Sequence, residues 1–482
     1  MFEILSSYWP HILAILSVTM GTVAAIHAAM TKREVRSALG WVGVIVLSPL
    51  LGALIYAIAG VNRIRRKSLI SRRSLHLDEL WRTLSHYEVS RDEVEAQFGN
   101  RMAGLKILGD RVAKHALSSG NRIDLLGSGT EAYAAFCAAI DAAERSIILE
   151  TYIFDRDAAG ERVADCLIAA RKRGVTVRVL VDAVGARYSV PSILGYLANG
   201  GVTVAAFNGK VVAGLRLPYA NLRTHRKILV VDGTMAFLGG MNIRAAFEGD
   251  AAARDTHFRL SGPAVADIFA VAAEDWHFEM GEILNGEVWN IAPFSAESGT
   301  PSFVRTVVSG PDSNLETNHK ILMGAFSVAE RSIRIMSPYF LPDNILLGAL
   351  ATAARRGVTV DVVVPARNNL AIVGHAMAAQ FDQVVRDGSR IFRAQGRFDH
   401  SKLITVDGRW AFVGSSNLDS RSLRLNFEID MEVFDTDFAA MIDRRIDGAL
   451  EGAEAVSLKE LSQRPFVFRL FNRILWLGSP YL

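Results

Sequence analysis

The chain has 482 residues, 50% of them hydrophobic, and a formal net charge of +3 at pH 7. This length accommodates one large domain, or two of ordinary size with appendages. The small net charge excludes a polycation that coats nucleic acid, and the two cysteines, Cys137 and Cys166, are too few for a disulfide scaffold or a cysteine metal cluster.

Two uncharged stretches near the N-terminus are long enough to cross a bilayer. Residues 4–31 and 37–62 contain no Asp, Glu, Lys or Arg, and a membrane-spanning helix needs about 20 mostly apolar residues. We therefore predict a transmembrane helical hairpin in residues 1–62, with helices at about 8–30 and 37–60. A cleaved signal peptide is the alternative, but the N-terminus lacks its basic start and a second apolar run follows at once.

Basic residues flank the predicted hairpin. The loop between the two stretches holds three Lys or Arg, and residues 63–73 hold six. Since cytoplasmic flanks carry the excess of positive charge, this bias predicts that both termini and the large C-terminal part lie in the cytoplasm. Residues 63–119 are predicted to form a basic, helical juxtamembrane linker. Its basic cluster either contacts anionic lipid headgroups or only fixes the topology.

The sequence after the linker repeats itself. The segment AERSI at 143–147 recurs at 329–333, and RGVTV at 173–177 recurs at 356–360. In each half, helical stretches alternate with apolar β-branched strands. This alternation predicts an α/β fold of two tandem α/β sandwich half-domains that pack about a pseudo-twofold axis. The predicted boundaries are 120–290 and 300–455.

Each half carries the same polar pattern, HxKxxxxD followed by GxxN, and the two copies lie 175 residues apart. The His and Lys of each copy directly precede a predicted strand, 228–231 or 403–406, so both project from one face. The Asn follows a Gly that allows close backbone approach. Together they suit a phosphodiester, so one site built from two half-sites is predicted. The paired residues are His225 and His400, Lys227 and Lys402, Asp232 and Asp407, and Asn242 and Asn417.

These residues predict displacement at phosphorus. A neutral imidazole attacks to form a phosphohistidine, and a second, protonated imidazole donates to the leaving oxygen. The lysines neutralise phosphate oxygens, and the asparagines bind the charge that develops. No cofactor is needed, and no clustered set of side chains with metal-ligand spacing argues for a metal.

Carboxylates are expected to orient the two imidazoles through their second ring nitrogen. Asp255 and Glu428 occupy matching places in the two halves, 30 and 28 residues beyond the respective histidines. Asp232 and Asp407 complete the motif and are counted with the catalytic set, although a structural role as charge partners near the strand ends is favoured. Two tyrosines at strand ends either contact substrate or pack in the core, namely Tyr152 and Tyr339.

Residues 456–482 form the predicted tail. Between Arg464 and Trp476, arginines alternate with large aromatic and aliphatic residues. That pattern predicts an amphipathic helix on the membrane surface. Packing of this helix on the protein's own core is the alternative.

At these residues the chain resembles the phospholipase D superfamily, and more narrowly the bacterial cardiolipin synthases within it. The resemblance covers nearly the whole length, including the hairpin and the two motifs. Asp399, before the second motif histidine, departs from the pattern, because an apolar residue is expected there. Further matching segments are ILETYIF at 148–154, SPYFLPD at 337–343, RDT at 254–256, NFE at 426–428 and SPYL at 479–482.

The resemblance implies that one phosphatidylglycerol transfers its phosphatidyl group to another, giving cardiolipin and glycerol, with His225 as nucleophile and His400 as acid and base. The implied partners are phosphatidylglycerol and other anionic phospholipids, with no nucleic acid. The implied place is the bacterial inner membrane, as a multi-pass protein.

A phospholipase D-type hydrolase and a transferase with another alcohol acceptor use the same chemistry and stay open. A nuclease or phosphodiesterase is disfavoured, because it needs a basic, aromatic-lined groove and no hairpin. An inactive membrane scaffold is disfavoured by the two intact His–Lys pairs.

Overall fold

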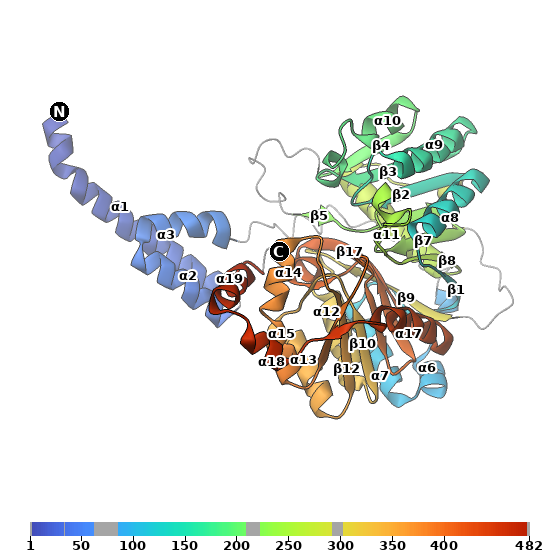
Figure 1. Ribbon diagram of the computed structural model, residues 1–482. Helices are drawn as coiled ribbons and strands as arrows, with labels where there is room; N and C mark the ends of the chain where they lie inside the picture. Colours follow the sequence, from blue (N-terminus) through green and yellow to red (C-terminus); the bar gives the residue numbers. More distant parts are fainter. Residues whose placement is uncertain (1, 33, 62–84, 209–221, 292–301, 480–482) are drawn as a thin grey trace. The chain divides into compact units, whose positions relative to one another are not determined.

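The computed structural model describes residues 2–32, 34–61, 85–208, 222–291 and 302–479 (Figure 1). Two compact units divide the chain. Residues 1–65 with 217–219 form the first, and the remainder forms the second. The basic cluster predicted at 63–73 lies outside the described residues, as does the end of the SPYL segment.

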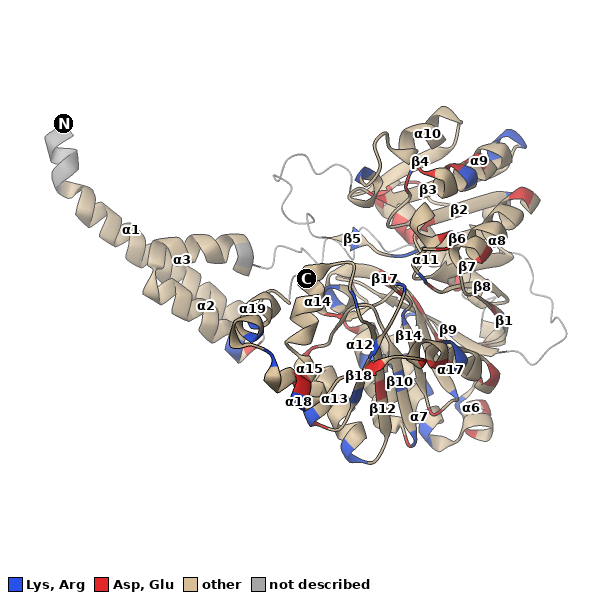
Figure 2. Cartoon of the chain, viewed as in Figure 1, with Lys and Arg blue, Asp and Glu red and all other residues tan. Residues whose placement is uncertain are grey.

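The first unit is helical and apolar. Helix α1 (Phe2–Thr31) contains a stretch, 8–31, that is long and apolar enough to cross a membrane, as predicted. Figure 2 shows residues 8–31 of α1 and the residues of α3 without Lys, Arg, Asp or Glu. Among the residues that the structure describes, α1 is the one helix that meets the length and composition of a membrane span.

The prediction of one continuous second helix over 37–60 is wrong. The structure breaks this stretch into α2 (Val35–Leu47), α3 (Pro49–Ile55) and a π-helical turn, Tyr56–Gly60. Pro49 lacks an amide hydrogen, and its ring disfavours helical backbone at the preceding residue. Ser48 accordingly leaves the helix, with φ of −145° and ψ of 80°.

One sheet runs through both halves of the second unit. Its strand order is β18-β13-β12-β10-β14-β15-β17-β9-β1-β8-β7-β6-β2-β3-β4. The first half contributes β1 (Ser118–Leu126), β2 (Ser146–Thr151), β3 (Thr176–Asp182), β4 (Thr203–Phe207), β6 (Ile228–Val231), β7 (Met235–Gly239) and β8 (His257–Ser261). The second half contributes β9 (Ser302–Ser309), β10 (Ser332–Met336), β12 (Thr359–Pro365), β13 (Arg390–Ala394), β14 (Leu403–Val406), β15 (Trp410–Gly414), β17 (Asn426–Phe434) and β18 (Glu454–Ala455).

The strand order makes the internal repeat visible. Read outwards from the centre, the first half runs β1, β8, β7, β6, β2, β3, β4, and the second runs β9, β17, β15, β14, β10, β12, β13. Strands β1 and β9 pair antiparallel and join the halves. The pseudo-twofold arrangement of two α/β half-domains is therefore confirmed (Figure 1).

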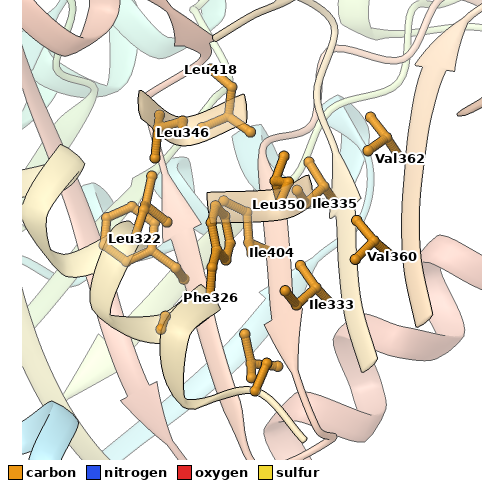
Figure 3. Close-up of a cluster of buried hydrophobic side chains, with 14 of the residues drawn as sticks. Leu322, Phe326, Ile333, Ile335, Leu346, Leu350, Val360, Val362, Ile404 and Leu418 are labelled. Atoms are coloured by element: carbon orange, nitrogen blue, oxygen red, sulfur yellow. The ribbon is translucent and has the colours of Figure 1, made fainter. Parts of the chain in front are cut away.

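Helices cover each half of the sheet because their apolar faces need burial. The second half-domain packs α12 and α13 against its strands, and Figure 3 shows Phe326 and Leu350 meeting Ile335 and Ile404 there. The helices of the first half are α8 (Gly129–Ala142), α9 (Ala158–Lys172), α10 (Ile193–Asn199) and α11 (Ala264–Met280). Those of the second half are α12 (Thr317–Val328), α13 (Asn344–Arg355), α14 (Ala371–Ala378), α15 (Phe381–Arg386), α16 (Ser420–Arg424) and α17 (Thr436–Leu450).

Part of the predicted linker over 63–119 is not a linker. Helices α6 (Arg91–Phe98) and α7 (Asn100–Val112) belong to the core of the second half-domain. The ring of Phe98 packs against Phe434 at 5.9 Å, and buried Arg305 pairs with Asp110 at 2.8 Å. The polar composition of this stretch suggested a solvated connector, but its apolar side chains bury against strands distant in sequence.

The tail forms two helices, α18 (Leu458–Gln463) and α19 (Phe466–Trp476). Helix α19 packs mainly against α14 and reaches α15 through an ion pair of Arg473 with Asp382, while many of its apolar side chains are exposed.

Candidate active site

The two motif histidines lie immediately before β6 and β14, and each is hydrogen-bonded to the opposite half-domain. The amide of His225 donates to the carbonyl of Phe427 at 2.9 Å, beside the parallel pairing of β5 (Arg223–Thr224) with β17. The amide of His400 donates to the carbonyl of Arg254 at 2.7 Å. Each half-domain therefore holds the histidine segment of the other.

The orienting carboxylates are also exchanged between the halves. Nδ1 of His225 lies 2.9 Å from Oε2 of Glu428, and Nδ1 of His400 lies 2.8 Å from Oδ2 of Asp255. Both carboxylate side chains are fully buried. A proton held on Nδ1 by the carboxylate leaves Nε2 of each ring as the nitrogen that can meet a substrate. These are the contacts predicted for Asp255 and Glu428, whose role in catalysis stays a prediction.

The pair around His225 favours a neutral imidazole. Burial, and then the cation of Lys227, lower the pKa of His225 well below its ordinary value. Burial raises the pKa of Glu428, and Lys227 opposes that rise. The lowered pKa therefore favours the neutral imidazole of His225, which carries one proton on Nδ1 and has a lone pair on Nε2, the form that a nucleophile needs.

The pair around His400 has a different charge balance. Burial and Lys402 lower the pKa of His400, while Asp255 opposes them. Burial alone would raise the pKa of Asp255, but Lys402 and His400 outweigh it, so this pKa is lowered. An ionised Asp255 stabilises the imidazolium that a proton donor at His400 requires.

Both motif lysines are buried beside the histidines. Nζ of Lys227 donates to the carbonyl of His225 at 2.5 Å, and Lys402 donates to the carbonyl of His400. Burial lowers the pKa of Lys227 to about 7 and that of Lys402 to about 8. A negatively charged phosphate that binds beside these lysines would raise their pKa and so favour the protonated, cationic form.

The two motif asparagines are held differently. Oδ1 of Asn242 accepts from the amide of Ile153 at 3.1 Å, which leaves its amide nitrogen to donate elsewhere. Nδ2 of Asn417 lies 3.4 Å from Oγ of Ser422. The predicted close approach at the preceding glycine is present, since a Cβ on Gly239 would lie 2.7 Å from the Cα of His257. Phosphate binding by the two asparagines stays a prediction.

Asp232 and Asp407 lie at the far ends of β6 and β14 from the histidines. The carboxylate of Asp232 accepts three backbone amides, from Glu144, Arg145 and Ser146, each at 2.8 Å. Asp407 accepts the three equivalent amides in the second half. These contacts fit the structural role that the sequence favoured, and the place of the two aspartates in the catalytic set stays a prediction.

Two tyrosine rings flank the histidines. The ring of Tyr152 lies 5.3 Å from that of His225, and the ring of Tyr339 lies 5.9 Å from that of His400. Contact of these two tyrosines with substrate stays a prediction. Asp399 accepts from the hydroxyl of Ser401 at 2.7 Å and pairs with Arg445, so it is satisfied within its own half.

Sequence reasoning missed Ser415 as a support for the site. Its hydroxyl donates to Oε2 of Glu428 at 2.6 Å and accepts from the amide of Ile429 at 2.9 Å. The first half has Gly240 at this place in the motif. Strand β15 pairs with β17 and sets Gly414 opposite Asp430, so Ser415 follows beside the strand that carries Glu428. This contact depends on strand pairing, so the motif alone could not have identified it.

Arg226, between the motif His and Lys, was also missed. It is fully buried, donates to the carbonyl of Glu428 at 3.1 Å and pairs with Asp275. It therefore ties the first motif to the strand that supplies the carboxylate.

Among the described residues, no three His, Cys, Asp or Glu side chains gather as metal ligands.

Comparison with known proteins places this geometry in a family. A family profile described as "Cardiolipin synthase, PLD-like domain" matches residues 136–267 and 322–449. The cardiolipin synthase of Alkalihalophilus pseudofirmus is 32% identical over 459 residues, which cover 94% of this chain and 90% of that protein. The chain belongs to the cardiolipin synthase family of the phospholipase D superfamily. It is thus a phospholipase D-type phosphatidyltransferase of phospholipid biosynthesis.

Other relatives agree with membership of the cardiolipin synthase family. Cardiolipin synthase A of Pseudomonas aeruginosa is 33% identical over 479 residues, covering 96% of this chain and 94% of that protein. A second profile, described as "Phospholipase_D-nuclease N-terminal", matches residues 21–60. The crystal structure of phosphatidylserine synthase from Haemophilus influenzae Rd KW20 aligns with a TM-score of 0.58 at 16% identity, covering 79% of this chain and all of that one, and so shares the fold.

Proposed function

We propose that this chain makes cardiolipin and glycerol from two phosphatidylglycerol molecules through a phosphohistidine on His225. The observation that carries the proposal is the pair of crossed contacts, His225 with Glu428 at 2.9 Å and His400 with Asp255 at 2.8 Å. Each contact leaves one imidazole nitrogen for a diester phosphorus or for a proton in transit. The family membership supplies the phospholipid substrate class.

In the first step, Nε2 of His225 attacks the phosphorus of one phosphatidylglycerol and forms an N–P bond. The P–O bond to the headgroup glycerol breaks, and His400 gives its Nε2 proton to the departing oxygen, so glycerol leaves neutral. Lys227 and Lys402 face the charge on the non-bridging oxygens, and Asn242 adds an amide donor.

In the second step, a headgroup hydroxyl of another phosphatidylglycerol gives its proton to Nε2 of His400, now a base. Its oxygen attacks the phosphorus, the N–P bond breaks, and cardiolipin forms. His225 returns to its neutral state and His400 to its protonated state, so protons balance over the cycle.

The different charge balance of the two His–carboxylate pairs supports this order of roles. Burial lowers the pKa of His225 well below its ordinary value, which suits a nucleophile. The lowered pKa of Asp255 keeps a full negative charge beside His400, which suits a group that must hold a proton. The reverse assignment would put the proton on the more strongly depressed imidazole.

The N-terminal unit fits lipid at both steps. Tethering by α1 keeps an insoluble substrate at high effective concentration. We further propose that α1 crosses the bilayer and that the catalytic unit faces the cytoplasm, in line with the basic flanks.

Mass spectrometry of the products from labelled phosphatidylglycerol in mixed detergent–lipid micelles tests the proposal. Cardiolipin with an equal amount of free glycerol is expected. Phosphatidic acid as the main product would replace the transferase by a hydrolase. Added short alcohols that become incorporated in place of the second lipid would assign another acceptor.

A further inference from the structure

Helix α19 carries large apolar side chains on its exposed surface while its other face is fixed. Val467 is 72% exposed. On the fixed face, Oδ1 of buried Asn472 lies 3.0 Å from Nδ1 of His375 in α14, and Arg473 pairs with Asp382 at 3.3 Å. The helix is therefore docked through polar contacts and presents its apolar residues outwards. The other exposed apolar residues are Phe466, Phe468, Leu470, Phe471 and Ile474.

Two further segments expose large apolar residues, one in each half-domain. Strands β3 and β12 are equivalent in the repeat, and the chain after each exposes large apolar residues. After β3 these are Tyr188 and Val190, the latter 93% exposed. After β12 they are Leu370 and Ile372, each about half exposed.

Contacts with the tyrosines beside the histidines place both loops at the active site. The hydroxyl of Tyr339, whose ring lies 5.9 Å from His400, donates to Oδ1 of Asn369 at 2.8 Å. On the other side, the loop after β3 packs against Tyr152, because a Cβ on Gly185 would clash with the carbonyl oxygen of Tyr152. The loops after β3 and β12 therefore border the tyrosines that flank the two histidines.

We propose that these two loops and the apolar face of α19 form one membrane-docking rim, which enters the lipid surface and brings the histidines to the headgroups. Isolated exposed apolar residues are ordinary, but a set of them near a site marks an interaction surface. The occupant is a bilayer, because α19 combines its exposed apolar residues with Arg469 and contains no acidic residue, which suits anionic headgroups. The inference rests on the proposed function, since it explains how lipid headgroups reach the site.

The rim has a task that the N-terminal anchor does not perform. A tether keeps the catalytic unit near the bilayer but leaves its orientation open. A rim around the mouth fixes the orientation, so that a phosphate reaches His225 while its acyl chains stay in the lipid.

The first test measures depth in the membrane with the full chain in vesicles of phosphatidylglycerol and phosphatidylethanolamine. Cys137 and Cys166 are replaced by serine, and a single cysteine at Val467 or at Val288 carries an environment-sensitive fluorophore. Val288 is a matched control: it is 40% exposed and its neighbour Glu287 contacts Arg145, at the strand ends far from the histidines. Lipids brominated on their acyl chains should quench the label at 467 several-fold more than the label at 288. Equal quenching, as expected if α19 packs on another part of the chain or on a protein partner, would overturn the rim.

The second test compares two substrates with the double variant Leu470→Glu/Ile474→Glu and the control Val288→Glu. Turnover of phosphatidylglycerol in vesicles should fall about tenfold or more in the double variant, because two large side chains lose their burial in lipid. Turnover of dihexanoyl phosphatidylglycerol, present as monomers in water, should stay unchanged. An equal loss on both substrates contradicts docking. If the unmodified chain makes cardiolipin from neither substrate, the proposed function fails, and the quenching experiment still decides the rim.

Discussion

Around His225 the orienting carboxylate is a glutamate held by Ser415, whereas around His400 it is an aspartate beside Gly240. The hydroxyl of Ser415 donates to Glu428 at 2.6 Å. A Cβ on Gly240 would lie 2.5 Å from Oδ1 of Asp255, so that place must stay empty. One half-site combines Glu428 with Ser415 and the other combines Asp255 with Gly240. Both carboxylates nevertheless lie at similar distances from the imidazole Nδ1, 2.9 Å and 2.8 Å.

This difference teaches how a duplicated motif can support two roles. The motif His, Lys and Asn, which we propose contact the phosphate, are the same in both halves. The groups behind them differ, and the pKa of Glu428 is raised while that of Asp255 is lowered. On the proposed assignment, the surroundings of the two identical histidines separate the nucleophile from the proton donor.

The largest expected effect comes from removing either histidine. His225→Ala and His400→Ala should each lower phosphatidyl transfer by about 10²–10⁴-fold or more. A phosphatidyl ester of p-nitrophenol separates them, because this leaving group needs no acid. His400→Ala should release a burst of nitrophenol and retain a phosphatidyl group on His225, detected by peptide mass spectrometry. A burst from His225→Ala instead would reverse the assignment.

Neutral isosteres of the carboxylates should have the next largest effect. Asp255→Asn and Glu428→Gln should each reduce kcat by about 100-fold or more, with KM little changed, because the imidazole loses its orientation and charge partner. Asp255→Asn should be the more harmful, since His400 must carry a proton. Steady-state kinetics on mixed micelles measure both constants, and equal losses would argue against distinct roles.

Gly240 and Ser415, which lie beside the two carboxylates at equivalent motif positions, can each be replaced by the other's residue type. Gly240→Ser should lower kcat by about tenfold or more, because its Cβ displaces Asp255. Ser415→Gly should cost about tenfold through the lost hydrogen bond to a charged group. Thermal unfolding serves as the control for misfolding. A fully active Gly240→Ser would show that Asp255 tolerates displacement and does not orient His400.

The pH profile of kcat/KM should shift in opposite directions in two variants. The protonated form of His400 is required, so kcat/KM falls as the pH rises through the pKa of His400. A lower pKa of His400 therefore moves this alkaline limb to lower pH. Asp255→Asn removes an anion and should move the alkaline limb down by about one pH unit, whereas Lys402→Gln removes a cation and should move it up by a similar amount. Glu428→Gln is the control that should leave this limb nearly in place. Shifts of the same sign would contradict His400 as the acid.

The smallest effect on rate is expected at the motif aspartates, where the halves should behave alike. Asp232→Ala and Asp407→Ala each leave three backbone amides without an acceptor. The free energy of unfolding should fall by about 2–4 kcal/mol, seen as a lower melting temperature, while kcat of the folded fraction changes less than threefold. A large loss of kcat without a loss of stability would support the place of these residues in the catalytic set.

Sequence alone predicted the strands 228–231 and 403–406 with their true bounds, because β-branched runs after a polar motif are a local signal. The break at Pro49 was also local and could have been predicted, since proline disfavours helix at the preceding residue. The burial of α6 and α7 could not, because their polar composition says nothing about which distant strands cover their few apolar residues.

The sequence by itself determined the reaction class, the duplication and the residue types of each half-site, because motif spacing and the repeat are properties of the chain order. Only the tertiary structure decided which carboxylate serves which histidine. His225 and Glu428 are 203 residues apart, and His400 and Asp255 are 145 apart. The pairing arises when β1 and β9 join the two sheets and β5 lies beside β17, which sets each histidine segment against the other half-domain. Such contacts depend on how two folded surfaces meet, and local pattern carries no record of that.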